Sequence, residues 1–376
     1  MELKRNIYER IKSDLRKKMV LIVGPRQVGK TWLAKEILKE YKQPVYLNYD
    51  NSEHKDIIKK GAWLPEADLV VFDEIHKMPE WKNYLKGIYD TKPEALHILV
   101  TGSARMNAFK SVGDSLAGRF YAHHLLPFTP AEIKETELGD SFSLLLERSG
   151  FPEPLLSEND EEADRWRQSY TESLLGQDVL EFQDIDKVNI IKQIYQLLKT
   201  KVGSPLSFNS IGRDLGVSPM TVKKYIEILE ALYVIFIIKP YTHKISRSIL
   251  KEPKIYFFDY GVIADPGARF ENFVALALLK HSVLRTDRTG KTLSLGFLKT
   301  KEKKEVDFAL YDGENNLLEI IEAKISDSSV SKTLEYFSEK YKIKGTQLVY
   351  NLTAERVSPK GVFIRNAEKY LNELEE

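Results

Sequence analysis

The chain contains no cysteine among its 376 residues. This absence excludes disulfide bonds, zinc sites with thiolate ligands and catalysis by a thiol. The chain also lacks an apolar run long enough to span a bilayer, and residues 1–18 are charged and amphipathic, unlike the apolar centre of a secretory signal. We therefore expect a cytoplasmic protein with no membrane partner.

Charge of one sign is not in excess either, because 56 Lys and Arg residues nearly balance 55 Asp and Glu residues, for a net charge of +1. This balance gives no overall field that would hold nucleic acid, so any such binding has to come from local basic patches. A length of 376 residues allows two or three domains with ample apolar core.

A glycine-containing segment near the N-terminus carries the strongest motif. Residues 24–31 read G-P-R-Q-V-G-K-T, after the apolar run 19–23 and before a helix-forming stretch. This is the pattern G-x-x-x-x-G-K-[ST] between a strand and a helix, where backbone N–H groups cradle phosphates. We expect Lys30 to reach the β- and γ-phosphates of ATP and Thr31 to ligate Mg²⁺. The predicted nucleotide-binding residues are Gly24, Pro25, Arg26, Gln27, Val28, Gly29, Lys30, Thr31 and Trp32.

Two carboxylates follow a second apolar run. Residues 69–72 are four consecutive apolar residues, which is typical of a strand buried on both faces of a parallel sheet. Asp73 and Glu74 come directly after it, at the edge where doubly wound sheets bind ligands. We predict that Asp73 holds Mg²⁺ beside Thr31 and that Glu74 orients and polarises the attacking water.

A third apolar strand, residues 97–101, leads into a polar segment. A polar side chain at this point would sense the γ-phosphate, and Ser103 or Thr101 is the candidate. This prediction depends on the two motifs before it.

Five segments of the chain, GPRQVGKT, VVFDEIHK, ILVTGSAR, SLAGRF and LLPFTPAEI, carry a family resemblance. They resemble a large group of archaeal and bacterial AAA-type ATPases that have a C-terminal domain of unknown function. The resemblance implies an α/β fold with a doubly wound P-loop AAA core at residues 1–130 and a helical lid at 131–187. It also implies a homo-oligomer, such as a hexameric ring, in which an arginine of a neighbouring subunit completes each site. Arg119 and Arg105 are candidates, and either is as readily a structural salt-bridge partner.

Residues 188–262 contain a helix-turn-helix pattern. Residues 207–215 fit a short helix and Gly216 a turn, while Ser218 followed by Pro219 is a strong helix start. Two short helices across a tight turn are typical of DNA-binding domains.

Two apolar strands at residues 233–238 and 255–258 follow, joined by a basic hairpin, and together with the two helices they resemble a winged helix. In a DNA-binding function, Thr221, Lys223 and Lys224 would contact DNA and the hairpin would contact phosphates. The alternative is a winged helix used for packing or oligomerisation.

Residues 263–376 hold a second set of charged residues. Glu271 lies beside an apolar helical stripe, Asp307 lies in a strand, and strand periodicity places Glu322 and Lys324 on one face of a second strand. The pattern is similar to the PD-(D/E)xK nucleases, so we expect an α/β restriction-endonuclease-like domain. Asp307, Glu322 and Glu271 would bind Mg²⁺ or Mn²⁺, and Lys324 would hold the nucleophile or the developing charge. The alternative is a degenerate nuclease fold that only binds DNA or stabilises an oligomer.

The first hypothesis for function is an ATP-hydrolysing protein that binds DNA, including branched or end structures, and remodels or processes it with a metal-dependent nuclease domain. A second is a nucleotide-switched scaffold that recruits a protein partner. A third is a defence or toxin-control ATPase whose nuclease fold acts only on a signal, or serves only for binding or oligomerisation.

Overall fold

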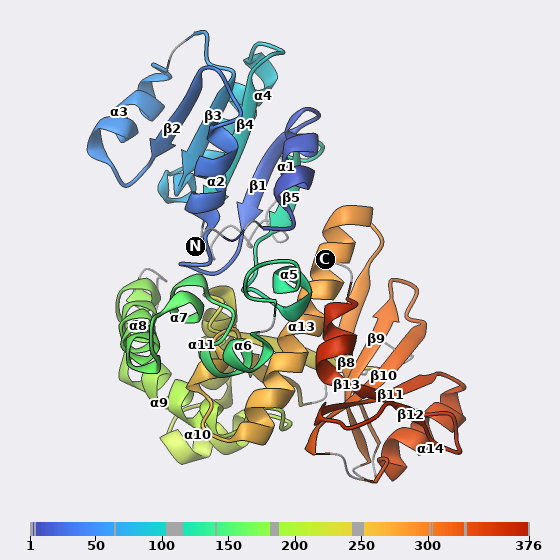
Figure 1. Cartoon of the computed structure of the whole chain (residues 1–376). Coiled ribbons are helices and arrows are strands. Elements are labelled where there is room, and N and C mark those ends of the chain that lie inside the picture. Colours follow the sequence, from blue (N-terminus) through green and yellow to red (C-terminus); the bar gives the residue numbers. More distant parts are fainter. Residues whose placement is uncertain are drawn as a thin grey trace. The chain divides into compact units, whose positions relative to one another are not determined.

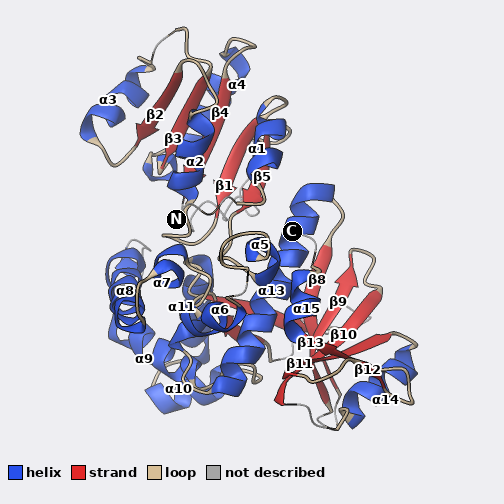
Figure 2. Ribbon diagram, viewed as in Figure 1, coloured by secondary structure: helices blue, strands red, loops and turns tan. Residues whose placement is uncertain are grey.

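The computed structural model divides into two compact units, Met1–Leu126 and Pro127–Glu376. It describes residues 3, 5–63, 65–102, 116–139, 141–180, 188–242, 252–300, 302, 304–326 and 329–374. Figure 1 traces both units along the chain, and Figure 2 shows their helices and strands. The predicted division into four domains stays a prediction.

The first unit is built on a parallel sheet of five strands in the order β2-β3-β4-β1-β5. The strands are β1 Met19–Val23, β2 Pro44–Asn48, β3 Leu69–Asp73, β4 His97–Gly102 and β5 Phe120–His124. The helices are α1 Tyr8–Leu15, α2 Lys30–Leu38, α3 Ser52–Lys60 and α4 Trp81–Thr91, with a 3₁₀ turn, η1 Ile75–Lys77. The three strands predicted around the nucleotide motifs are therefore confirmed as β1, β3 and β4.

Helices cover both faces of this sheet (Figure 2). Every residue of β1 and β3 is buried, as expected for apolar runs in a parallel sheet. On one face, alternate residues of β1 share a core with Ile58 of α3 and Leu85 of α4. Because neighbouring residues of a strand point to opposite faces, Val20 and Ile22 belong to the other face, where α1 and α2 pack.

The second unit contains an eight-stranded sheet in the order β12-β13-β11-β10-β9-β8-β6-β7. The strands are β6 Ile235–Pro240, β7 Lys254–Phe257, β8 Leu293–Lys299, β9 Glu305–Asp312, β10 Leu317–Ser326, β11 Lys344–Asn351, β12 Arg356–Val357 and β13 Phe363–Asn366. The helices are α5 Pro130–Ile133, α6 Phe142–Arg148, α7 Pro152–Leu156, α8 Asp160–Ser173, α9 Val188–Lys199, α10 Phe208–Leu215, α11 Pro219–Ala231, α13 Pro266–Thr289, α14 Lys332–Tyr341 and α15 Ala367–Asn372. A π-helical turn, η3 Leu174–Asp178, follows α8, and a 3₁₀ turn, η4 Tyr260–Val262, precedes α13.

The helix-turn-helix pattern corresponds to α10 and α11. Gly216 ends α10 in the left-handed conformation with φ 65°, and the Ser218 hydroxyl caps α11 by accepting from the Thr221 N–H at 3.0 Å. The following strands β6 and β7 pair antiparallel, but β6 also pairs with β8 through Lys239 and Gly296. The two strands therefore extend the sheet built by the later residues, and the predicted basic hairpin between them lies largely outside the described residues.

Helix α13 lies against β7, β8 and β10 and is the longest described helix. The Asn272 amide accepts from the Phe257 N–H at 2.7 Å and donates to the Phe257 carbonyl at 2.8 Å, which satisfies the backbone of the edge strand β7. Within the part of the chain that the structure describes, this helix and the others are too short or too polar to cross a membrane.

Candidate functional site

Two glycines shape the loop between β1 and α2. Gly24 has φ 154° and Gly29 has φ 98°, a region of backbone space that favours glycine. A Cβ at position 24 would lie only 2.1 Å from the Leu125 carbonyl oxygen, so no larger residue fits there. Gly29 is the N-cap of α2, which leaves the first N–H groups of that helix directed at the loop. The loop thus has the conformation expected of a phosphate cradle, and phosphate binding by its residues stays a prediction.

Lys30 opens α2 and lies inside this loop. Lys30 is only 6% exposed. Its Nζ donates to the Gly24 carbonyl at 3.0 Å and to the Pro25 carbonyl at 2.5 Å. Burial lowers the pKa of Lys30 to about 8, although Glu74 and Asp73 act in the opposite direction. A buried ammonium held only by neutral carbonyls in these bonds is well suited to receive phosphate oxygens.

Asp73 ends β3, and hydroxyl groups from three elements converge on it. Its carboxylate accepts from Thr31 at 3.0 Å, from Tyr46 at 2.5 Å and from Thr101. The pairing of Thr31 with Asp73 is the arrangement that the sequence predicted for a shared Mg²⁺ ion. Tyr46 of β2 was missed, although strand periodicity gives it the same face as Asn48, which pairs with Asp73 across β2 and β3.

Glu74 has the left-handed backbone conformation, with φ 55°. Its N–H donates to the Thr101 carbonyl at 3.1 Å, which ties it to β4. Within the described residues its buried Oε2 accepts no hydrogen bond, and it lies 3.5 Å from His76 Nε2 and 3.9 Å from Lys77 Nζ. Burial raises the pKa of Glu74. A strained backbone and an unbonded carboxylate oxygen are typical of a residue that works on a water molecule.

The predicted γ-phosphate sensor is only partly described. The hydroxyl of Thr101 donates to Asp73, so it serves the carboxylate. Ser103 and Arg105 lie outside the described residues.

Arg119 lies near the N-terminal end of β1, because its carbonyl accepts a hydrogen bond from the N–H of Met19. Lys30 follows the loop at the C-terminal end of the same strand. The Arg119 guanidinium makes two bonds to Asp90, at 2.7 and 3.0 Å. This is the salt-bridge alternative of the sequence analysis, and a role in a neighbouring subunit stays a prediction.

Arg5 is a contributor that sequence reasoning missed. It is 3% exposed, and its guanidinium donates to the Val28 carbonyl at 2.9 Å and to the Leu126 carbonyl. The arginine therefore braces the phosphate loop against the end of the first unit. A single arginine before the first strand gives no signal in the sequence.

Two of the predicted carboxylates of the second unit, Glu271 and Asp307, lie near Lys254, the first residue of β7. Its Nζ is 2.8 Å from Glu305, 3.6 Å from Glu271 and 3.7 Å from Asp307. Burial opposes its charge, but these three carboxylates prevail and raise the pKa of Lys254. Burial and the neighbouring Asp307 raise the pKa of Glu271 to about 7. Sequence reasoning missed both Lys254 and Glu305.

Glu322 and Lys324 lie on one face of β10, as predicted, with Nζ and Oε1 2.9 Å apart. The second oxygen of Glu322 is buried and accepts no hydrogen bond from the described residues. Burial, and then Asp307, raise the pKa of Glu322. Asp307 also accepts from the N–H of Ala323 at 3.1 Å, between Glu322 and Lys324.

The structure therefore brings the predicted nuclease-like residues into one neighbourhood, but their arrangement does not fit a metal ion. Among the described residues, no group of three or more His, Asp or Glu side chains is placed to hold one. The ammonium of Lys254 lies among the carboxylates instead.

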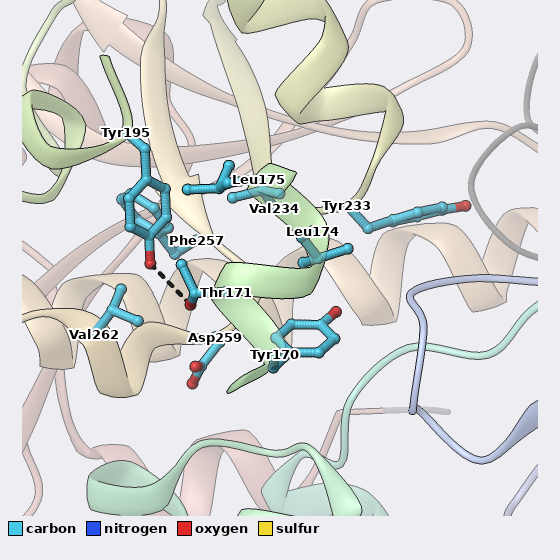
Figure 3. A pocket seen from close by; sticks show the side chains of 10 residues that line it. All are labelled: Tyr170, Thr171, Leu174, Leu175, Tyr195, Tyr233, Val234, Phe257, Asp259 and Val262. Carbon is cyan, nitrogen blue, oxygen red and sulfur yellow. Dashed lines mark hydrogen bonds between the residues drawn. The ribbon is translucent and has the colours of Figure 1, made fainter. Parts of the chain in front are cut away.

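The second unit contains a small cavity lined by residues of several elements (Figure 3). It measures about 10 Å³ and lies beside the π-helical turn. Thr171 and Tyr195 approach each other across it at 3.4 Å, and Asp259 at its border is paired with Arg167 at 3.2 Å. Such a cavity has room for about one water molecule, so it does not fit a nucleotide or a base.

Three family models match successive parts of the chain. Residues 16–134 match a model described as an AAA domain. Residues 139–265 and 266–369 match two models described as domains of unknown function, DUF8612 and DUF4143. The boundary between the last two matches falls at the start of α13.

The chain is similar to uncharacterized proteins of archaea and bacteria. An uncharacterized protein of Methanocaldococcus jannaschii is 22% identical over 361 residues, which cover 86% of this chain and 79% of the relative. An uncharacterized protein of Mycobacterium tuberculosis is 24% identical over 249 residues, and the match spans 65% of this chain but only 55% of the relative.

Some solved structures resemble the chain, with low TM-scores and low sequence identity. A Walker-type ATPase of Pyrococcus abyssi is 17% identical with a TM-score of 0.44, over 71% of this chain and 95% of that chain. The RuvB Holliday junction branch migration motor of Thermotoga maritima is 19% identical with a TM-score of 0.35, over 61% and 88%. Likenesses this distant carry no argument about DNA or assembly. Residues 16–134 match the AAA domain model, and the phosphate loop and the five strands of the first unit lie within that match.

Proposed function

We propose that the protein hydrolyses ATP in a Mg²⁺-dependent reaction at Lys30, Thr31, Asp73 and Glu74, and that it uses this reaction to act on DNA. The observation that carries the first part is the meeting of Thr31 and Asp73 at 3.0 Å beside a carboxylate oxygen of Glu74 that accepts no hydrogen bond among the described residues. These groups supply the phosphate, metal and water contacts that phosphoryl transfer requires.

Each residue has a distinct part in the reaction. The Lys30 ammonium binds the β- and γ-phosphate oxygens and stabilises the charge that develops between them. The Thr31 hydroxyl and Asp73 carboxylate would hold Mg²⁺, which neutralises phosphate charge when it is bound. The Glu74 carboxylate orients the attacking water by accepting a hydrogen bond from it, and takes its proton as the water attacks.

Two variants test the hydrolytic site. Lys30→Ala is expected to lose ATP binding and turnover. Glu74→Gln is expected to keep ATP binding while turnover falls by roughly a hundredfold or more, the usual contribution of a general base. Turnover at the unsubstituted rate in Lys30→Ala would contradict the assignment of the phosphate loop.

The DNA-directed part of the proposal is supported by the exposed side of α11. Met220 at its first turn is 72% exposed, and the Lys223 side chain is 51% exposed, whereas Val222 and Ile226 are buried. Lys223 and Lys224 follow this first turn and are exposed, and the N-terminal part of the second helix is the part of a helix-turn-helix that contacts DNA.

A panel of single-stranded, blunt, forked and four-way DNAs tests this part by stimulation of ATP hydrolysis. Lys223→Gln with Lys224→Gln is expected to abolish the stimulation and leave the basal rate unchanged. The matched control is Lys59→Gln with Lys60→Gln in the last turn of α3. Equal loss in both double variants, or no stimulation by any DNA, would remove DNA from the proposal.

A second candidate function is a nucleotide-controlled binding module whose C-terminal region does not cut DNA. The observation that favours it is the position of Lys254 among Glu271, Glu305 and Asp307. Metal-dependent cleavage by Asp307, Glu322 and Lys324 would require those carboxylates to be free for a metal ion.

A further inference from the structure

Lys254 is one of the most deeply buried charged residues of the second unit, at 1% exposure. It begins β7, and the three carboxylates around it come from α13 and β9. The ring of Phe297 from β8 lies 5.3 Å from its Nζ. The ammonium therefore occupies a protein interior in which its counter-charges come from other elements.

The carboxylate oxygens near Lys254 are already engaged. Glu271 accepts from the Tyr256 hydroxyl at 2.7 Å with the same oxygen that faces Lys254. Asp307 turns one oxygen to Lys254 and receives the Ala323 N–H with the other. Glu305 is held between Lys254 on one oxygen and Lys299 on the other, at 2.8 and 3.2 Å.

The backbone at Gly203 packs directly against the Glu271 carboxylate. Gly203 packs so closely that a Cβ at its position would lie 2.5 Å from Glu271 Oε1. The Gly203 N–H donates to the Ile255 carbonyl of β7 at 3.3 Å, which fixes this segment beside the cluster. The carboxylate is thus packed on one side by backbone and bonded on another by protein donors.

A divalent metal ion needs several oxygens at about 2.0–2.6 Å, and an ammonium group among those oxygens repels it and competes for them. The Lys254 ammonium lies within 4 Å of three of the oxygens that a metal ion at Glu271 and Asp307 would draw on. The carboxylate side chains are 18 to 24% exposed, whereas Lys254 is 1% exposed, so the buried ammonium is the group that most needs its partners.

We propose that Lys254 is a built-in cation that takes the place of a divalent metal ion in the cluster of Glu271, Glu305 and Asp307. The cluster then joins β7, α13 and β9 through one buried ammonium group, binds no divalent metal and cleaves no DNA. The residues that support this proposal lie in the second unit. The proposal can therefore be tested independently of ATP hydrolysis at the site in the first unit.

The test is a titration of the full-length protein with Mn²⁺, followed by electron paramagnetic resonance, without nucleotide. Asp73→Asn is present in every sample to remove the metal ligand of the first unit. The cluster with Lys254 is expected to show no saturable Mn²⁺ binding. Lys254→Met, which keeps the side-chain length and removes the charge, is expected to gain one bound Mn²⁺, and adding Asp307→Asn is expected to abolish that gain.

The matched control is Lys299→Met, which removes the outer partner of Glu305 but leaves Lys254 in place. It is expected to gain no Mn²⁺ site. Saturable Mn²⁺ binding with Lys254 present that Asp307→Asn removes would overturn the proposal, and so would a folded Lys254→Met variant that binds no Mn²⁺.

If Lys254→Met does not fold, two measurements on the chain with Lys254 decide the question. No saturable Mn²⁺ binding and no Mn²⁺-dependent nicking of plasmid DNA are expected. Nicking that Asp307→Asn abolishes would contradict the inference.

Discussion

At the scale of single residues, Lys30 gives the ATP site a pH dependence. Its pKa of about 8 is lowered by burial from an ordinary value of 10.5, so the free site loses its ammonium as the pH rises through about 8. Phosphate oxygens bind the charged form, so the affinity for ATP is expected to be constant below this pH. Above it, the Kd should rise by up to about tenfold per pH unit.

Calorimetry from about pH 7 to about pH 9 measures this dependence, in buffers with different heats of ionisation. Proton uptake on binding is expected near the upper end of the range. A Kd for ATP that does not change across the range would show that Lys30 stays charged in the free protein.

Tyr46 is a second residue whose contribution can be isolated. Tyr46→Phe removes the hydroxyl that donates to Asp73 at 2.5 Å and changes nothing else in the side chain. Loss of a bond to a charged group costs about 1.5–3 kcal/mol, so Mg²⁺-dependent turnover should fall by roughly tenfold or more. Tyr84→Phe is the control, because its hydroxyl donates to the Ile58 carbonyl in the same unit. Equal turnover in the two variants would show that Asp73 does not need the Tyr46 hydroxyl.

At the scale of elements, the LPFTPAEI segment is fixed to α13 by a buried ion pair. Lys280 Nζ lies 2.5 Å from Glu132 of α5 and 3.1 Å from the Thr129 hydroxyl, and both charged side chains are 2% exposed. Lys280→Met leaves the carboxylate buried without this partner, which should destabilise the second unit by about 3–5 kcal/mol.

Urea unfolding measures this loss, and Lys280→Met with Glu132→Leu is expected to recover most of it because no buried charge is left. The control is Lys134→Met, whose Nζ makes an exposed bond to the Asn372 carbonyl at 3.0 Å. A Lys280→Met variant as stable as the control would mean that the pair contributes nothing to the docking of α5.

The elements that the sequence predicted correctly are those whose signal is local. Each of these features can be recognised from a few neighbouring residues. They are the apolar runs of β1 and β3, the glycines of the phosphate loop and the Ser218 cap. Contributors that depend on tertiary pairing were missed. Tyr46 reaches Asp73 only because β2 pairs with β3, and Lys254 meets Glu305 only because β7, β9 and α13 come together.

The same limit explains the nuclease-like prediction. Glu322 and Lys324 were placed on one face by strand periodicity alone, and the structure has them 2.9 Å apart. The pattern of acidic residues does not indicate that Lys254, about fifty residues before Asp307 in the chain, lies beside them. In our proposal, that lysine prevents the acidic residues from binding a metal ion.

At the scale of the whole molecule, Arg119 separates a subunit-completing role from a structural one. In an oligomer that uses Arg119 in trans, Arg119→Ala should reduce turnover strongly, whereas Asp90→Ala should not, because the guanidinium stays available. Mixing Arg119→Ala with Lys30→Ala subunits should then restore part of the activity. Equal effects of Arg119→Ala and Asp90→Ala, with no recovery on mixing, would leave only the ion pair seen at 2.7 and 3.0 Å.

The most direct test of the central claim is calorimetric titration of the purified protein with ATP and Mg²⁺. We expect saturable binding that is kept in Glu74→Gln, because the carboxylate acts on water, and lost in Lys30→Ala, because the ammonium holds the phosphates. No heat of binding with the unsubstituted protein, or full binding by Lys30→Ala, would contradict the ATPase site described for the first unit.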